Sequence, residues 1–187
     1  TEGRLTTITL PCGSYPATSA KREGALLTIY LENTALPEST EGIAAPMIKE
    51  ARWEETEGGV NLLLTGLTGT GKTWMACTFG HAAAALELSV GYYRVGPLLE
   101  ELELARHDGL RVKKLENLRR LDLLVLDDLG LEELTQRARI DLLNLLEDRV
   151  GRHSTIVAAQ MPVNKWHDYL GGDATADAIM DRLVHSS

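Results

Sequence analysis

From residue 60 to the C-terminus, the pattern of apolar and polar residues changes repeatedly between that of a strand and that of a helix. The pattern predicts strands at Val60–Thr65, Ser89–Val95, Leu121–Leu126 and Thr155–Ala159, and the apolar run Leu121–Leu126 is of the buried, parallel kind. Apolar residues three or four positions apart predict helices at Lys72 to about Leu86, Pro97–His107, Arg137–Val150 and Thr175–His185. This alternation predicts an α/β fold in which a parallel sheet has helices on both faces.

Residues 1–59 have a different character. They contain four of the six prolines and no long helical periodicity, and their two short β-like runs, Leu5–Leu10 and Leu26–Leu31, lie among turn residues. We therefore expect two parts. Residues 1–59 form an N-terminal segment that has no assigned role and is loosely ordered by itself, and residues 60–187 form the core.

Composition and charge limit the classes of function. The chain has 187 residues, of which 44% are apolar and 25% charged, so it suits one globular domain with an appendage. Its formal net charge of −8 means that any contact with nucleic acid has to come from a local basic area. No apolar run approaches the roughly 20 residues that a membrane span needs, and no signal segment opens the sequence. We expect no membrane contact and a cytoplasmic location.

The most informative stretch follows the first predicted strand of the core. It matches the P-loop pattern G-x-x-x-x-G-K-[ST] in full, and its residues are Gly66, Leu67, Thr68, Gly69, Thr70, Gly71, Lys72 and Thr73. Glycines let backbone N–H groups curl around phosphate oxygens, and the following helix points its positive end at the same anion. We expect Lys72 to reach the β- and γ-phosphates and Thr73 to ligate Mg²⁺. The motif predicts a bound magnesium–nucleoside triphosphate, with ATP as the expected nucleotide.

A second motif is an apolar strand that ends in two acids, Asp127 and Asp128. Such a strand brings carboxylates to the C-terminal edge of the sheet, where ligands of open α/β sheets bind. We expect Asp127 to be the magnesium partner, mostly through water, and Asp128 to orient or polarise the attacking water. An exposed acidic turn is the alternative, but the position after the P-loop, with one strand between, favours the metal site.

Two further residues are candidates for roles at the phosphates. Gln160 follows the fourth strand of the core and can hydrogen-bond the γ-phosphate or the water, or it is a polar residue that merely ends a strand. Arg182 lies on the last predicted helix and can act as an arginine finger that reaches the phosphate of a neighbouring subunit. For Arg182 the sequence pattern alone favours the alternative, a surface ion pair with an acid.

The segment Arg106–Arg120 is the best candidate for contact with DNA. It holds six Lys or Arg residues against Asp108 and Glu116, which gives it a net charge of +4 in an acidic protein. Such a local patch suits the phosphate backbone of double-stranded DNA. An ordinary solvated face is an equally good interpretation of the same residues.

Several stretches together resemble the IstB-like ATPases, which are AAA+ helper proteins of insertion-sequence transposition and relatives of the DnaC-type helicase loaders. The resemblance covers about residues 60–187, and the stretches that carry it are Asn61–Thr73, Leu123–Leu131, Glu147–Val157, Pro162–Leu170 and Ala176–His185. The P-loop alone is shared by a very large superfamily. The Asp-Asp-Leu-Gly-Leu and Lys-Trp-His blocks make the resemblance specific.

The resemblance implies an ATP-dependent homo-oligomer that assembles on double-stranded DNA and assists a partner transposase. It also implies that ATP lies at subunit interfaces, that Arg182 is the arginine finger, and that slow ATP hydrolysis acts as an assembly switch. A DnaC-type helicase loader is the nearest alternative. An ATP-binding remnant without turnover and a P-loop kinase of small metabolites are the others.

Three departures from the family pattern bear on these expectations. Residues 1–59 do not resemble the basic, helical N-terminal region of the family, and Ala158 and Ala159 stand where the γ-phosphate sensor strand usually carries Thr or Ser. The family continues with a strand and a helical lid after the point where this sequence ends, at Ser187. Because that strand normally flanks the P-loop strand, we expect an unpaired sheet edge there, unless Leu26–Leu31 fills it.

Overall fold

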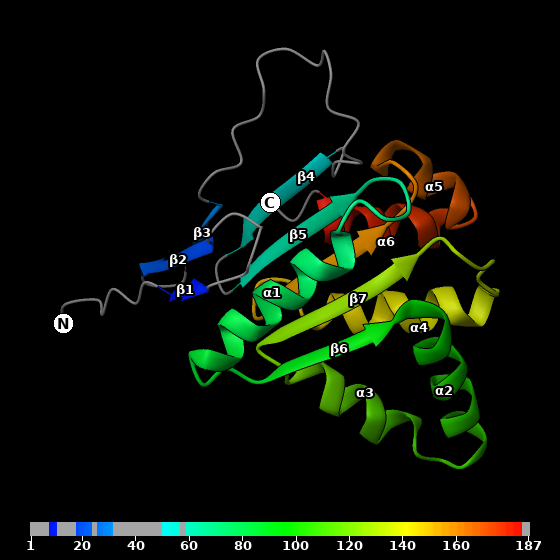
Figure 1. Ribbon diagram of the computed structural model, residues 1–187. Helices are drawn as coiled ribbons and strands as arrows, with labels where there is room; N and C mark the ends of the chain where they lie inside the picture. The colour runs from blue at the N-terminus through cyan, green and yellow to red at the C-terminus, as the bar shows by residue number, and fades with distance from the viewer. Residues whose placement is uncertain (1–7, 11–17, 24–25, 32–49, 57–58, 185–187) are drawn as a thin grey trace. The chain divides into compact units, whose positions relative to one another are not determined.

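The computed structural model describes residues 8–10, 18–23, 26–31, 50–56 and 59–184, and the chain divides into two compact units, Thr1–Pro46 and Met47–Ser187 (Figure 1). The described part of the first unit is an antiparallel sheet with strand order β1-β2-β3. Its strands are β1 (Ile8–Leu10), β2 (Thr18–Glu23) and β3 (Leu26–Leu31). β3 coincides with a predicted β-like run and β1 with the end of the other, whose residues 5–7 lie outside the described residues. β2 has no apolar alternation and is not predicted from the pattern.

The second unit is built on a five-stranded sheet with the order β4-β5-β8-β7-β6. Its strands are β4 (Glu50–Thr56), β5 (Gly59–Thr65), β6 (Val90–Arg94), β7 (Leu123–Leu129) and β8 (Ser154–Ala159). β5, β8, β7 and β6 run parallel, so their C-terminal ends meet at one edge of the sheet. This confirms the predicted parallel sheet of the core.

The edge of the sheet beside the P-loop strand is paired. β4 runs antiparallel to β5 over its whole length, from Glu50 opposite Thr65 to Thr56 opposite Gly59. The expectation of an unpaired edge is therefore wrong, and so is the alternative that Leu26–Leu31 fills it, because β3 pairs with β2. The compact unit that contains the P-loop begins at Met47 rather than at Val60, since β4 belongs to the same sheet.

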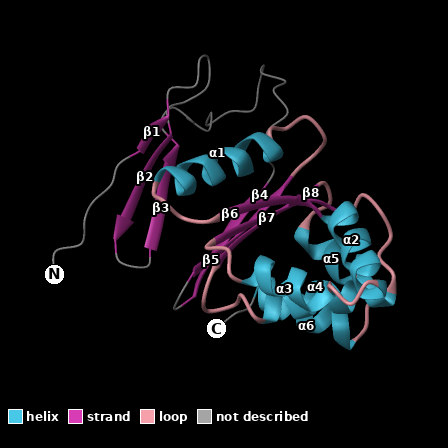
Figure 2. Ribbon diagram, turned by 90° about the horizontal axis from the view of Figure 1, so that it is seen from below, coloured by secondary structure: helices cyan, strands magenta, loops and turns pink. Residues whose placement is uncertain are grey.

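Helices cover both faces of the sheet, as the sequence predicts. They are α1 (Lys72–Ala85), α2 (Val95–His107), α3 (Arg111–Arg119), α4 (Gln136–Glu147), α5 (Trp166–Tyr169) and α6 (Ala174–Val184), with a 3₁₀ turn at Val163–Lys165. Figure 2 shows α1 on one face and the other helices on the opposite face. Several boundaries differ from the prediction: Val95 begins a helix instead of ending a strand, β7 continues to Leu129, and α4 ends at Glu147. The basic segment contains the unpredicted helix α3.

The core explains why these residues form these elements. The apolar run of β7 is buried on both faces, since all residues from Leu123 to Leu126 are at most 5% exposed. α4 buries Leu142, Leu145 and Leu146 in this core, and its first turn is capped by Thr135, whose hydroxyl accepts a 3.1 Å hydrogen bond from the Ala138 N–H. None of the helices among the described residues is long and apolar enough to cross a membrane.

Arg149 is a charged residue in the interior. It follows α4 and is 1% exposed, and burial lowers its pKa to about 10. Its guanidinium donates hydrogen bonds to four backbone carbonyl oxygens and one hydroxyl, those of Leu118, Arg119, Leu121, Ser154 and Thr155. One side chain therefore joins the end of α3 and the approach to β7 to the start of β8.

Candidate nucleotide-binding site

The P-loop connects β5 to α1 at the C-terminal edge of the sheet. Gly69 and Gly71 have φ angles of +80° and +86°, a region that residues with a side chain rarely adopt. A Cβ atom on either glycine would meet no atom within 4 Å, so the backbone conformation, not a lack of space, requires glycine there. The Gly66 N–H donates to the Ala159 carbonyl of β8 at 3.3 Å and ties the start of the loop to the neighbouring strand.

Lys72 is the first residue of α1 and lies inside the loop. It is 8% exposed, and its Nζ donates 2.8 Å hydrogen bonds to the carbonyl oxygens of both Gly66 and Leu67. Burial lowers the pKa of this ammonium, while the nearby carboxylates of Asp127 and Asp128 oppose that shift. The positive charge is therefore held within the curl of the loop, close to the acids of β7.

Asp127 is buried at the end of β7, with 1% of its surface exposed. Its Oδ2 accepts hydrogen bonds from the Thr73 hydroxyl at 2.6 Å and from the Tyr92 hydroxyl at 2.8 Å. Its Oδ1 accepts the backbone N–H of Asp128 at 2.8 Å. The two residues that the sequence predicts for the metal, Thr73 and Asp127, are thus in direct contact although they are far apart in the chain.

This donor set fits Mg²⁺. A hydroxyl and a carboxylate are hard oxygen ligands, and Mg²⁺ usually takes one or two protein oxygens together with phosphate oxygens and waters. Among the described residues no group of three or more His, Cys, Asp or Glu side chains could hold a metal ion by itself. Thr73 and Asp127 are therefore suited to a metal that arrives with a nucleotide rather than to a metal cage.

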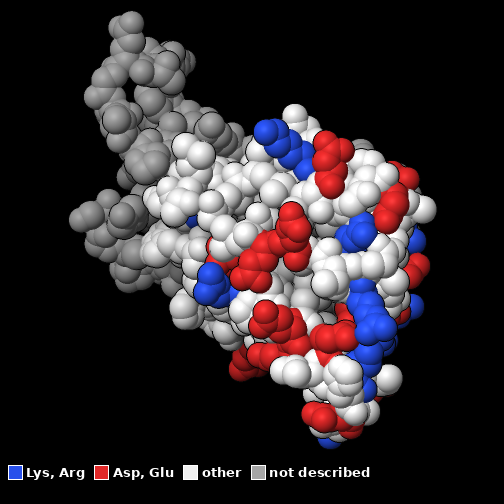
Figure 3. All heavy atoms as spheres, turned by 90° about the vertical axis from the view of Figure 1, so that its right-hand side faces the viewer, with Lys and Arg blue, Asp and Glu red and all other residues white. Residues whose placement is uncertain are grey.

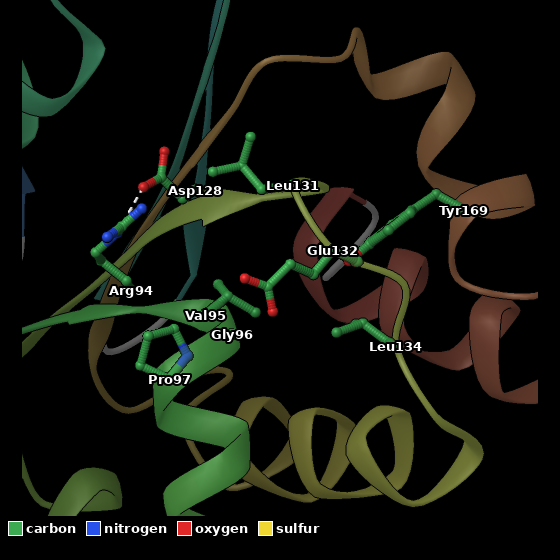
Figure 4. Close-up of a pocket in the computed structure, with 9 residues that line it drawn as sticks. All are labelled: Arg94, Val95, Gly96, Pro97, Asp128, Leu131, Glu132, Leu134 and Tyr169. Carbon is green, nitrogen blue, oxygen red and sulfur yellow. Dashed lines mark hydrogen bonds and ion pairs between the residues drawn. The ribbon is translucent and has the colours of Figure 1, made fainter.

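Asp128 has a strained backbone and a cationic partner. Its φ angle is +62°, at a shift of register between Leu126 and Leu129 in the ladder of β7 with β8. Its Oδ2 accepts a 2.7 Å hydrogen bond from Nε of Arg94, the last residue of β6. Figure 4 shows the two side chains pointing toward each other beside a hollow that is lined by the start of α2, the segment after β7 and Tyr169.

Gln160 comes directly after β8 and reaches the P-loop. Its Oε1 accepts a 2.9 Å hydrogen bond from the Thr68 hydroxyl. Ala158 and Ala159, which replace the usual hydroxyl residues of the sensor strand, are completely buried. After the end of this strand, the Gln160 amide is thus a polar side chain in contact with the loop.

Arg182 lies away from the P-loop of its own chain. Its backbone carbonyl accepts a 2.9 Å hydrogen bond from Asn61 Nδ2, near the start of β5, whereas the loop begins after the end of that strand. The strand between Asn61 and Gly66 spans roughly 16 Å. The guanidinium pairs with Asp181 at 2.6 Å and with Glu147 of α4 at 3.3 Å. Arg182 thus makes the surface ion pair that the sequence pattern favours.

Four of the six basic residues in the segment Arg106–Arg120 form ion pairs with acidic side chains of the same chain. Arg106 and Arg111 both bind the buried carboxylate of Asp141, Arg106 through 2.8 and 3.0 Å hydrogen bonds. Ion pairs also engage Lys114 with Glu101 and Arg119 with Asp148. The two other basic residues of the segment, Lys113 and Arg120, are exposed. On the side of the molecule that Figure 3 presents, Lys and Arg lie among Asp and Glu side chains.

Two residues of the site, Tyr92 and Arg94, are not predicted from the sequence. Both lie on β6, whose parallel register puts Tyr92 beside Val125 and Arg94 beside Asp127. Burial and the hydrogen bond to Asp127 raise the pKa of Tyr92. A polar residue at the end of a predicted strand is a signal for Arg94, but only the adjacency of β6 and β7 shows which acids these residues contact.

A parallel sheet with a P-loop after β5 and a buried aspartate near the end of β7 defines the class of the second unit: it has the fold of a P-loop NTPase domain of the AAA+ type. A solved structure of the DnaC helicase loader has the same fold, with a TM-score of 0.55, 22% identity, and coverage of 68% of this chain and 76% of that one. Within this class, the chain belongs to the IstB-like ATP binding protein family, which matches residues 42–187.

Relatives support the family assignment. An insertion-sequence ATP-binding protein of Sinorhizobium fredii, y4pL, is 43% identical over 163 residues, which are 84% of this chain and 66% of that protein. The ATP-binding protein of insertion sequence IS1162 from Pseudomonas fluorescens is 49% identical over 102 residues, 54% of this chain and 44% of that protein. The chain therefore spans two-thirds or less of the length of these relatives.

Proposed function

We propose that this chain binds Mg²⁺–ATP through its P-loop and acts as an ATP-dependent helper protein of DNA transposition. The observation that carries the proposal is the contact between the Thr73 hydroxyl and the Asp127 carboxylate at 2.6 Å, directly beside the buried Lys72. A loop, a lysine and two oxygen ligands in this arrangement suit the phosphates and the metal of a nucleoside triphosphate.

Each residue of the loop has a role in binding. The backbone N–H groups of the loop after Gly66 are available to the phosphates, and the first turn of α1 directs its positive end toward them. The Lys72 ammonium exchanges its two carbonyl partners for β- and γ-phosphate oxygens. Thr73 and Asp127 would hold the magnesium ion, which would supply positive charge beside the phosphates.

Hydrolysis is assigned to the residues at the ends of β7 and β8. Asp128 orients or polarises the attacking water, and its ion pair with Arg94 fixes the direction of the carboxylate. Gln160, held against the loop by Thr68, hydrogen-bonds the γ-phosphate or the same water. Because Arg94 competes for the carboxylate that the water needs, we expect slow turnover, which suits a switch rather than a metabolic enzyme.

The proposed assembly is a homo-oligomer with ATP at the interfaces between subunits. Arg182 is too far from its own loop and pairs instead with Glu147 and Asp181. A guanidinium held at the surface by exposed carboxylates can exchange them for the phosphate of a neighbouring subunit. ATP binding then stabilises the assembly, and hydrolysis releases it.

Double-stranded DNA and a transposase are the proposed partners. In the segment Arg106–Arg120, Lys113 and Arg120 are exposed, and the half-buried Arg119 can exchange the carboxylate of Asp148 for a DNA phosphate. The relatives are named as ATP-binding proteins of insertion sequences, which favours a transposition helper over a DnaC-type helicase loader. Phosphate contacts of this kind carry no sequence information, so they support assembly on DNA in general.

ATP turnover of the purified chain, with and without duplex DNA, tests the proposal when light scattering follows the assembly state. We expect turnover that DNA stimulates and assembly that requires ATP. Lys72→Ala should abolish both, because the β- and γ-phosphates lose their cation. A folded chain that binds ATP but neither hydrolyses it nor assembles would instead be an ATP-binding remnant, and unchanged nucleotide affinity in Lys72→Ala would exclude the P-loop as the site.

A further inference from the structure

The carboxylate that is proposed to face the metal is also held by a residue outside the P-loop and the acidic strand. Tyr92 lies on β6, the strand next to β7, and its hydroxyl donates a 2.8 Å hydrogen bond to Asp127 Oδ2. The same oxygen accepts the Thr73 hydroxyl at 2.6 Å. The Tyr92 hydroxyl therefore contacts the same carboxylate oxygen that joins Asp127 to Thr73, although 42% of Tyr92 is exposed.

The Tyr92 contact limits how many acceptor positions of the Asp127 carboxylate remain free. Each carboxylate oxygen can accept about two hydrogen bonds. Asp127 Oδ2 uses both on the hydroxyls of Thr73 and Tyr92, and Oδ1 uses one on the Asp128 N–H. One acceptor position remains, on Oδ1, for a water molecule of the metal. The three donors together fix the rotation of a carboxylate that is 1% exposed.

We propose that Tyr92 is a positioning residue of the magnesium site. Its hydroxyl holds the Asp127 carboxylate in the orientation in which Oδ2 stays on Thr73, and the remaining acceptor position of Oδ1 would be available to a water molecule of the metal. The inference rests on the proposed function, since it requires Mg²⁺ to bind at Thr73 and Asp127. Hydrogen-bond partners of this kind behind metal-binding residues affect metal affinity about 10- to 100-fold in other proteins.

Tyr93 provides a matched control in the same strand. Successive side chains of a strand point to opposite faces, so Tyr93 points away from Asp127 and packs against the hydrophobic core. Within the described part of the chain its hydroxyl makes no hydrogen bond, so Tyr93→Phe removes the same atom without touching the site. A role of Tyr92 in mere packing would survive Tyr92→Phe, because the ring is retained.

The experiment measures the Kd of a fluorescent, non-hydrolysable ATP analogue for the full chain, once in excess Mg²⁺ and once in EDTA. The Kd in EDTA divided by the Kd in Mg²⁺ reports how strongly the metal supports binding, and the measurement involves no turnover. We expect Tyr92→Phe to reduce this ratio about tenfold relative to the wild type, with the Kd in EDTA and the melting temperature unchanged. Tyr93→Phe should keep the wild-type ratio.

The other outcomes separate this inference from the proposed function. A wild-type ratio in Tyr92→Phe would overturn the role of Tyr92 and leave the magnesium site in place. An equal loss of affinity with and without Mg²⁺ would also overturn it, because the hydroxyl would then support the loop and not the metal. If the wild-type chain itself binds the analogue equally well in Mg²⁺ and EDTA, the proposed metal site fails, and the inference fails with it.

Discussion

Asp127 and Asp128 are neighbours in the chain, but the structure gives them different surroundings. Asp127 is buried, and three hydrogen-bond donors fix both of its carboxylate oxygens. Asp128 has a φ angle of +62° and a partly exposed carboxylate that pairs with Arg94. A buried, fully oriented carboxylate suits a fixed ion, whereas a reachable carboxylate with one exchangeable partner suits a water molecule.

The first prediction concerns Asp128. We expect Asp128→Asn to keep the nucleotide bound and to lower the ATP turnover rate by about a hundredfold or more, because the metal is still held while the water loses its base. Asparagine is the appropriate substitution, since it tolerates a positive φ better than most residues with a side chain. Equilibrium binding of ATP and steady-state phosphate release measure the two effects separately.

A control for this variant is Glu133→Gln, which changes an exposed acid in the segment after β7. It should leave both the affinity and the turnover rate unchanged. If Asp128→Asn instead loses nucleotide binding, Asp128 is required for the metal or for the fold of the site, and its assignment to the water is wrong.

At the scale of the elements, the site is assembled from the ends of four parallel strands. β5 leads into the P-loop, β6 ends at Arg94, β7 carries the two aspartates just before its last residue, and Gln160 follows β8. The order β5-β8-β7-β6 puts β8 between the P-loop strand and the acidic strand. Because all four strands run in the same direction, residues far apart in sequence come together at one edge.

The opposite end of the sheet depends on Arg149. Its guanidinium donates hydrogen bonds to four backbone carbonyl oxygens, including those of Leu118 and Leu121. We expect Arg149→Met to lower the free energy of unfolding by about 3 kcal/mol or more, because buried carbonyl groups lose their hydrogen bonds. Urea or thermal unfolding measures the change.

Arg152 is a matched control for this variant, since it lies three residues further on and is exposed. Arg152→Met should change the free energy of unfolding by at most about 0.5 kcal/mol. Equal stability of Arg149→Met and the wild type would mean that water or a rearranged backbone satisfies the carbonyl groups.

At the scale of the whole molecule, the position of Arg182 decides how the proposed switch can work. The guanidinium pairs with acids of α4 and α6, and the backbone of Arg182 lies near the start of β5, away from the P-loop. A contribution of this residue to hydrolysis therefore requires a second copy of the chain. The ion pairs with Glu147 and Asp181 are contacts that assembly has to replace.

The corresponding prediction uses mixed subunits. We expect Arg182→Ala to bind ATP like the wild type and to lose turnover by about 10³-fold, as arginine fingers do elsewhere. Lys72→Ala should be inactive for a different reason, because its own P-loop no longer binds the nucleotide. A mixture of the two variants should therefore regain part of the activity, since Arg182 of the Lys72→Ala chain can act at the intact P-loop of the Arg182→Ala chain. Phosphate release from the mixture is the measurement.

Arg137 supplies the control, because it is an exposed arginine in an ion pair with Glu103 on a helix of the same layer. Arg137→Ala should keep the full turnover rate. If the mixture of Arg182→Ala and Lys72→Ala stays as inactive as its components, Arg182 does not act on a neighbouring chain.

The sequence by itself determined the fold class and the nucleotide-binding motif. Local patterns suffice for these: continuous apolar runs mark buried strands, and the P-loop is one uninterrupted segment from Gly66 to Thr73. The strand that ends in Asp127 is recognisable for the same reason. Each of these signals depends on residues that are adjacent in the chain.

Only the tertiary structure decided the contacts between distant segments. Tyr92 and Arg94 became part of the site because β6 pairs with β7, and β4 covers the edge of the P-loop strand although its polar sequence gives no clear strand signal. Four basic residues of Arg106–Arg120 found acidic partners, two of them the same buried Asp141. The periodicity of apolar residues predicts the type of a single element. Which strand lies beside another, and which acid pairs with which base, depends on how the elements pack in three dimensions.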